Sequence, residues 1–208
     1  MIESVFDYEP HVRLAAFAGV FALMAAWEVF APRRRQAIGR AVRWPSNLGV
    51  VALDAAIVRV LFPTSAVALA MLAESGGWGI LNAWAAPAWL AIPLAIVVLD
   101  LVIYLQHVLF HAVPALWRLH RMHHADLEFD VTTGARFHPI EIVLSMLIKL
   151  TVVAALGAPP VAVLVFELLL NATAMFNHSN VRLPGPVDRV LRLFVVTPDM
   201  HRVHHSIV

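Results

Sequence analysis

Long apolar runs separated by short polar segments dominate the pattern of this chain. The first run extends from Val12 to Ala31, the second from Asn47 to Ala73, and the third from about Ala88 to Phe110. A helix needs about 20 predominantly apolar residues to cross a bilayer. Two charged residues and a proline interrupt the second run, whereas the other two are nearly continuous. We therefore predict an all-α integral membrane protein.

A fourth apolar region, Ile140 to about Phe176, contains the segment Gly157-Ala158-Pro159-Pro160 near its centre. Proline is not tolerated inside a continuing helix and glycine permits a reversal, so this region is predicted to be a helical hairpin. Lys149 and Glu167 lie at equal distances from Ala158 along the two arms. Because an isolated charge at membrane depth is costly, we expect these two side chains to pair across the arms. The alternative is that Lys149 snorkels to the interface while Glu167 stays protonated or faces a substrate cavity.

The charges that flank the first run predict its orientation. Acidic residues precede the run, and five arginines follow it between Arg33 and Arg43. By the positive-inside rule the N-terminus is outside and the Arg33–Arg43 loop is cytoplasmic. This topology returns the third run and both ends of the hairpin to the cytoplasmic side. The 14 arginines against one lysine suggest a bacterial protein, and hence the inner membrane.

Composition narrows the possible chemistry. The chain is 61% hydrophobic and 14% charged, with a net charge of +1, which gives no basis for a nucleic-acid partner. It contains no cysteine, so thiolate zinc sites, iron–sulfur clusters and disulfides are excluded within this sequence. There is no internal repeat or linker, and we expect one domain over residues 1–208.

Ten of the eleven histidines lie in the second half of the chain, and most fall at spacings of three or four residues. Such spacings place two imidazoles on one face of a helix, and neutral imidazole is the commonest side-chain metal ligand. Together they predict a histidine-rich helical cap, on the cytoplasmic side, that holds metal. The candidate ligands are His107, His111, His120, His123, His124, His138, His178, His201, His204 and His205.

Nine or ten imidazoles are too many for one ion, and two metal ions fit the number. Imidazole suits iron, zinc, copper and nickel alike. We interpret the pattern as a di-iron centre that activates O2 against a C–H bond. The alternative is a non-redox protein with two zinc ions that are structural, hydrolytic or transported. Hydrolysis would need a carboxylate base, which Asp126, Glu128 or Asp199 could supply.

Two further residues have expected roles with alternatives. Asp100 lies two helical turns before His107, where it could accept the second imidazole N–H or simply pack in the bundle. His138 precedes Pro139, where a helix would begin, so it could bind metal or cap that helix. Asp100 and Asp199 are the two carboxylates that we expect to take part in catalysis.

The ordered motifs resemble the fatty acid hydroxylase/sterol desaturase superfamily from about Asp100 onward. They read Asp100-x-x-x-Tyr104-x-x-His107-x-x-x-His111, Leu116-Trp117-Arg118-x-His120-x-x-His123-His124, Arg136-Phe137-His138-Pro139-x-Glu141, His178-Ser179-Asn180 and Thr197-Pro198-Asp199-x-His201-Arg202-x-His204-His205-Ser206. The resemblance implies a membrane-embedded di-iron oxygenase that hydroxylates or desaturates a lipid. It implies that nine histidines bind the metal: His107, His111, His120, His123, His124, His178, His201, His204 and His205.

Two positions of the sequence differ from the usual pattern of the superfamily. Ala174 stands where some members have an additional histidine, so either His138 is the substitute ligand or one metal ion is left a ligand short. Members usually continue for tens of residues after the last histidine box, so we expect the natural chain to extend beyond Val208.

The superfamily acts on sterols, fatty acyl chains, ceramides, ether lipids, carotenoids and bacterial aminolipids, and the motifs do not choose among them. Because the sequence contains no haem-binding segment, the expected electron donor is a separate ferredoxin or cytochrome b5. Four arginines could dock that donor or instead face anionic lipid: Arg118, Arg121, Arg189 and Arg192.

Overall fold

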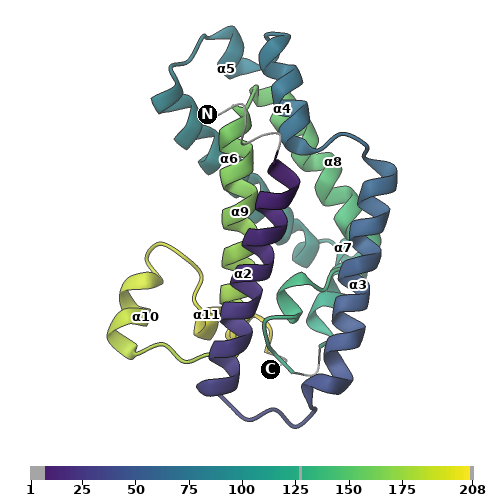
Figure 1. The fold of residues 1–208 in the computed structure, drawn as a ribbon, viewed down its shortest axis with the longest axis vertical. Helices are drawn as coiled ribbons and strands as arrows, with labels where there is room; N and C mark the ends of the chain where they lie inside the picture. Colours follow the sequence, from purple (N-terminus) through teal and green to yellow (C-terminus); the bar gives the residue numbers. More distant parts are fainter. Residues whose placement is uncertain (1–7, 127, 207–208) are drawn as a thin grey trace. The chain divides into compact units, whose positions relative to one another are not determined.

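The computed structural model describes residues 8–126 and 128–206, and this part of the chain is predominantly helical (Figure 1). The helices are α2 Glu9–Phe30, α3 Arg40–Leu61, α4 Ala66–Ser75, α5 Ile80–Ala83, α6 Ala88–Ala112, α7 Pro114–His124, α8 Pro139–Leu156, α9 Pro160–Asn177, α10 Gly185–Leu191 and α11 Pro198–His204. A short 3-10 turn, Thr133–Ala135, precedes α8. Within the described ranges there is no β-strand.

Five helical stretches are long and apolar enough to cross a membrane, judged by length and composition. They are Glu9–Phe30, Arg40–Ala83, Ala88–Ala112, Pro139–Leu156 and Pro160–Asn177. Each predicted apolar run corresponds to one of these stretches, and the two arms of the hairpin account for the last two. The prediction of an all-α membrane protein is confirmed.

The second apolar run is not one helix. α3 ends at Leu61 and α4 begins at Ala66, with Pro63 between them. Proline has no backbone N–H to donate, and the Ser65 hydroxyl accepts a hydrogen bond from the Ala68 N–H at 3.1 Å to start the new helix.

The chain folds into two compact units, each assembled from separate segments. The first unit contains residues 1–51, 122–136 and 168–208, and the second contains residues 52–121 and 137–167. Because neither unit is a continuous stretch of sequence, no simple boundary divides the chain, and a single domain remains a prediction.

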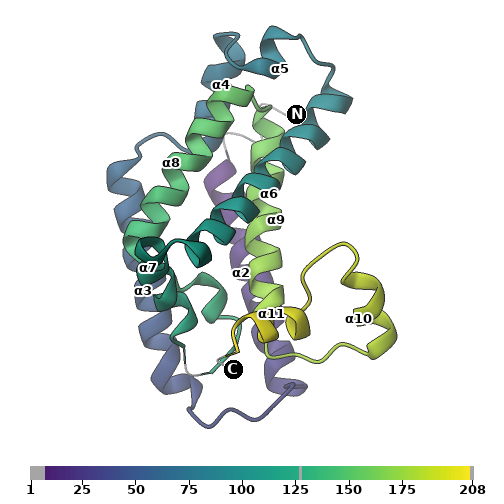
Figure 2. The ribbon, with the colours of Figure 1, turned by 180° about the vertical axis from the view of Figure 1, so that it is seen from behind.

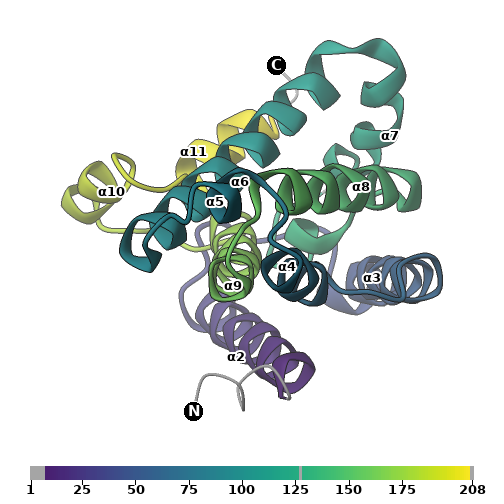
Figure 3. The same cartoon turned by 90° about the horizontal axis from the view of Figure 1, so that it is seen from above.

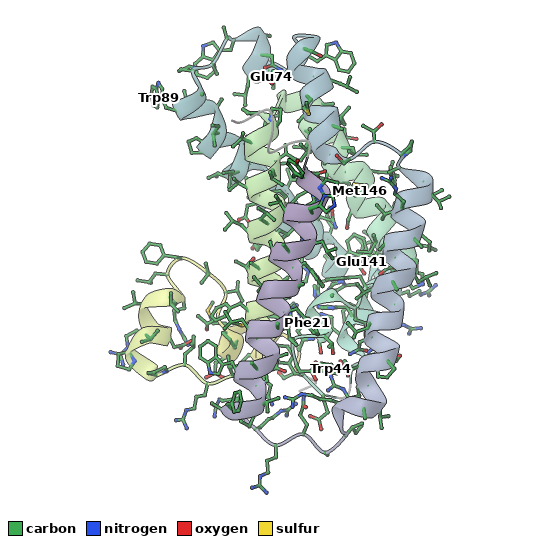
Figure 4. The ribbon with its side chains drawn as sticks, viewed as in Figure 1. Phe21, Trp44, Glu74, Trp89, Glu141 and Met146 are labelled. Atoms are coloured by element: carbon green, nitrogen blue, oxygen red, sulfur yellow. The ribbon has the colours of Figure 1, made fainter. Side chains whose placement is uncertain are left out.

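The core of the first unit is formed by Met24, Val131 and Met175, which come from α2, the loop after α7, and α9. Aromatic side chains cover this core. The rings of Phe21 and Trp44 meet edge to face with centroids 5.5 Å apart (Figure 4). The apolar core thus holds the loop at Val131 against the membrane helices of its own unit.

Arg43 fixes the same loop with charge. Its guanidinium donates to Asp126 Oδ2 at 2.6 Å, to Asp130 Oδ2 at 2.6 Å and to the Glu128 carbonyl at 2.8 Å. Burial alone would raise the pKa of Asp126, but hydrogen bonds from Arg43, Thr133 and Asn47 hold that pKa below its ordinary value. Both carboxylates are therefore ionised partners of Arg43.

In the second unit, α8 packs against α4, α5 and α6 (Figure 3). α8 ends at Gly157, which has a left-handed backbone with φ of 66°, and α9 begins at Pro160. A Cβ on Gly79 would lie 2.1 Å from the Gly157 nitrogen, so the turn is also a point of close backbone approach. The predicted hairpin is confirmed. Lys149 Nζ contacts Glu167 Oε1, and the predicted pair across the arms is confirmed as well.

Candidate metal centre

Four histidines converge in the first unit. They are His123 at the end of α7, His178 just after α9, and His201 and His205 on and after α11. Each offers one ligand nitrogen, and these four nitrogens all lie within 4.8 Å of one another. Three segments that are far apart in sequence therefore meet around one point.

The spacing of the nitrogens suits a single ion. His178 Nε2 lies 3.0 Å from His123 Nε2 and 2.8 Å from His201 Nε2. Two nitrogens that are each about 2.1 Å from one ion, at right angles, would be about 3.0 Å apart. The imidazoles thus already have the spacing that a shared ion requires.

The other ring nitrogens are held by backbone carbonyls. His178 Nδ1–H donates to the Ala174 carbonyl at 2.7 Å, and His123 Nδ1–H donates to the Arg136 carbonyl at 3.1 Å. A proton on Nδ1 leaves the lone pair on Nε2, the nitrogen that points into the cluster. This arrangement orients a metal-binding imidazole and selects its tautomer.

The surroundings keep these imidazoles neutral. Burial, and then the nearby His201, lower the pKa of His178 well below its ordinary value, and burial and His178 lower the pKa of His205. Phe129 covers the cluster, with its ring centroid 5.5 Å from that of His178 and 5.2 Å from that of His205. A neutral imidazole is the form that binds metal.

His124 and His204 extend this group. Their ligand nitrogens and that of His205 lie within 4.8 Å of one another. The His124 and His205 rings stack with centroids 4.0 Å apart. Six of the seven imidazoles of the first unit are therefore gathered in one region, and His11 on α2 is not among them.

A second convergence lies within the second unit. His107 and His111 occupy the last turns of α6, and His120 lies on α7. Each pair among these three rings has a centroid separation of 4.8 Å, and their ligand nitrogens lie within 4.8 Å of one another. The i and i+4 spacing of α6 places two of them on one face, as expected.

Glu141 is the carboxylate that supports this second group. Its Oε1 is 2.7 Å from His120 Nδ1, and both side chains are buried. Glu141 lies in the first turn of α8 (labelled in Figure 4). Glu141 is part of the motif Arg136-Phe137-His138-Pro139-x-Glu141, but the sequence alone assigned it no role. Its place two residues after Pro139, in the first turn of the expected helix, was the one local feature that could have pointed to it.

The other two predicted carboxylates have surroundings that differ from that of Glu141. Asp100 is exposed on α6, and no hydrogen bond or ion pair to it is found within the described ranges. Seven residues of helix rise about 10 Å, too far for Asp100 to reach His107 directly. Asp199 instead pairs with Arg33, at 3.1 Å, and lies 3.8 Å from Arg202.

His138 caps α8. Its Nδ1 accepts a hydrogen bond from the Ile140 N–H at 3.1 Å, which is the alternative expected from its place before Pro139. With the lone pair of Nδ1 in use, the neutral ring carries its proton on Nε2 and cannot bind metal through that atom. His138 is not among the converging histidines of the described residues.

Two residues that the sequence did not single out position the first group. Glu28 Oε1 accepts hydrogen bonds from the backbone N–H groups of Val131 and Asn180, both at 2.8 Å. A Cβ on Gly134 would lie 2.7 Å from the Ala174 carbonyl oxygen and 3.0 Å from His178 Nδ1. Nothing local in the sequence reports either contact, because both join segments that are far apart along the chain.

The residues proposed as a hydrolytic base are engaged elsewhere. Asp126 is held by Arg43, and Glu128 Oε1 accepts the Ala37 N–H at 2.6 Å. Asp199 faces Arg33. These contacts weaken the hydrolytic alternative, since a general base needs an accessible lone pair near the reacting water.

Comparison with known proteins agrees with this histidine arrangement. The model of the family "Fatty acid hydroxylase" matches residues 92–208. A curated relative, ornithine lipid hydroxylase OlsE of Rhizobium tropici, is 31% identical over 121 residues, which cover 58% of this chain and 35% of the relative. The match therefore spans well under half the length of that relative. No solved structure matches. Because the family model covers more than half of the sequence, the chain belongs to the fatty acid hydroxylase family.

Proposed function

We propose that this protein is an O2-dependent di-iron oxygenase that hydroxylates a C–H bond of a membrane lipid, with desaturation as the related outcome. The observation that carries the proposal is the convergence of imidazole Nε2 atoms whose Nδ1 atoms are held by carbonyl acceptors. Family membership and the five apolar helices support a lipid substrate within a membrane.

The four imidazoles of the first unit, His123, His178, His201 and His205, would hold one iron ion. His107, His111 and His120 would contribute to the other. His124 and His204 are further proposed ligands that we assign to neither ion. Bound iron would supply the activation of O2 that no amino-acid side chain provides.

The chain's own residues prepare this site. Glu141 and the carbonyls of Arg136 and Ala174 fix which nitrogen of each imidazole faces inward. Phe129 limits the access of water to the first group. Water exclusion matters because a reactive oxidant must meet the lipid before it meets solvent.

The substrate and the partners are also proposals. The relative is named an ornithine lipid hydroxylase, so a bacterial aminolipid is the first substrate to test, and hydroxylation is favoured over desaturation. We propose that a separate ferredoxin or cytochrome b5 supplies electrons, and that the histidines face the cytoplasm of a bacterial inner membrane.

Metal content and product analysis test the function together. Protein purified without oxygen should contain two iron ions and show the Mössbauer spectrum of a coupled pair. Lipids of a host that expresses the gene should gain one oxygen. His123→Ala and His107→Ala should abolish this product and lower the iron content. His11→Ala, at an exposed position near the start of α2, should leave both the product and the iron content unchanged.

The same measurements distinguish the alternative. Two zinc ions, no iron under anaerobic purification, and no oxidised lipid would refute the oxygenase and favour the non-redox dizinc protein. Wild-type product from His123→Ala or His107→Ala would refute the assignment of the metal centre.

A further inference from the structure

The segment from α10 to Phe194 carries an apolar face that is open to its surroundings. Val187, Val190 and Phe194 are 45%, 58% and 80% exposed, and Leu193 is 76% exposed. Val187 and Val190 are spaced at i and i+3, which places them on one side of α10, and Leu193 and Phe194 lie in the turn that follows. Large exposed apolar side chains that adjoin one another mark a surface with a partner.

This face is presented by an ordered turn. The chain continues past Leu191 in hydrogen-bonded turns, since the N–H groups of Leu193 and Phe194 donate to the carbonyls of Val190 and Leu191 at 3.2 and 2.9 Å. Figures 1 and 2 show α10 projecting sideways from α2 and α11, which belong to the same unit. The large exposed fractions of its apolar side chains show that they are not covered by the described part of the chain.

Basic residues lie within and next to the same segment. Arg182 and Arg189 are exposed, and Arg192 pairs with Asp188 one turn earlier. A helix with arginines beside a row of large apolar side chains is the pattern of an element that lies in the membrane interface. At seven residues α10 is far too short to cross a bilayer.

We propose that α10 and the turn to Phe194 form an interfacial anchor that inserts its apolar side chains among lipid acyl chains and places its arginines against anionic headgroups. Only residues 178–184 separate α10 from the end of α9, a candidate membrane span, so α10 stays within reach of the bilayer surface. The charge of Arg182 and Arg189 matches anionic lipid. This proposal is independent of the metal chemistry.

The anchor has a structural role because of what it connects. The chain enters it from His178 and leaves it toward His201, two imidazoles of the first unit whose Nε2 atoms lie 2.8 Å apart. An anchor in this connection holds the segment along the membrane surface.

Site-specific fluorescence tests the proposal, because the sequence has no cysteine and a single introduced thiol can be labelled alone. Phe194→Cys carries a bimane label in the full chain, reconstituted into phosphatidylcholine vesicles with and without phosphatidylglycerol. Arg35→Cys, an exposed position in the α2–α3 loop of the same unit, is the matched control. Quenching is measured with a doxyl-labelled lipid and with aqueous acrylamide.

We expect the doxyl lipid to quench the label at position 194 strongly and acrylamide to quench it weakly, with the reverse at position 35. Adding phosphatidylglycerol should deepen the insertion at position 194, and Arg182→Gln with Arg189→Gln should remove that gain. Strong acrylamide quenching at 194, equal to that at 35, would show a water-facing surface and overturn the proposal. Protection from both quenchers would show that protein covers the face, and would overturn it as well.

Discussion

Replacing Glu28 tests whether a membrane-helix carboxylate positions the first histidine group. Glu28 is 1% exposed near the end of α2, and its Oε1 accepts the backbone N–H groups of Val131 and Asn180. Val131 belongs to the loop that carries Phe129, and Asn180 follows His178 by two residues. One oxygen atom therefore joins the two segments that surround the buried imidazole.

The expected cost follows from these contacts. Glu28→Leu leaves two buried N–H groups without an acceptor, at about 1–3 kcal/mol each, so the folded unit should lose about 2–6 kcal/mol. Arg40 lies 3.6 Å from Oε2 but is partly exposed, and its lost attraction should add less than about 1 kcal/mol. Glu28→Gln keeps an oxygen with two lone pairs, so it should cost only about 1–2 kcal/mol.

Thermal unfolding in detergent and iron content measure this prediction. The order of stability should be wild type, then Glu28→Gln, then Glu28→Leu, and only Glu28→Leu should lose most of the bound metal. Glu9→Leu is the matched control, because Glu9 is also buried on α2 but pairs with Arg13 at the other end of the helix. It should lower stability without changing metal stoichiometry.

Two results would refute the reasoning. If Glu28→Leu unfolded at the wild-type temperature with full metal content, the two hydrogen bonds would contribute nothing measurable. If Glu28→Gln lost as much metal as Glu28→Leu, charge rather than hydrogen bonding would be the function of the carboxylate.

Further substitutions and pH probe the remaining contacts. Lys149→Met should destabilise the fold by about 3 kcal/mol because it leaves the buried Glu167 without its ion-pair partner. The double variant with Glu167→Leu should recover most of that loss in thermal melts in detergent, and additive losses would contradict the pair. Glu141→Leu should weaken metal binding about 10–100-fold in chelator competition, and Glu141→Gln less, because the amide oxygen can still accept the imidazole proton. Gly134→Ala should lower iron content because its methyl group meets a backbone oxygen at 2.7 Å, whereas Gly19→Ala, with open space around it, should not. The pKa of His178 is lowered in the folded apo-protein, so the neutral ring stabilises the fold fully above the unfolded-state pKa of about 6.5, and this stabilisation is lost as the pH falls toward the folded pKa. Equilibrium melts of the apo-protein from pH 8 to 5 should therefore show a melting temperature that begins to fall near pH 6.5. A melting temperature that does not change over this range would argue against a neutral buried imidazole.

Periodicity and length predicted most of the fold. The apolar runs, the Gly-Pro reversal and the pairing of Lys149 with Glu167 depend on local sequence and on distance from one turn, and each is confirmed. Helix ends were less accurate, since α2 begins at Glu9 rather than at Val12. The charged residues near its start do not prevent helix formation, because Glu9 and Arg13 pair one turn apart.

The site was predicted in part. Spacing identified most of the imidazoles that converge, because they lie three or four residues apart on α6, α7 and α11, whereas His178 is isolated in the sequence. The supporting contacts were not predictable, since Glu28 reaches Val131 and Asn180 across 103 and 152 residues. The expectation that Asp100 supports His107 rested only on the helical repeat, which places both residues on one face. It did not take into account that two helical turns separate them by about 10 Å along the axis. Glu141 performs the comparable role for His120 from a different helix.

The imidazoles of the first group are far apart along the chain, so an ion bound to them would cross-link distant segments. His123 and His178 are 55 residues apart, and His178 and His201 are 23 residues apart, so one ion would close two consecutive stretches of chain that meet at His178. Closure of both stretches needs all three segments, so binding of the proposed ion would be a late step of biogenesis. Iron supply would then control how long newly made protein survives membrane proteases, and scarcity would reduce abundance before it limited turnover.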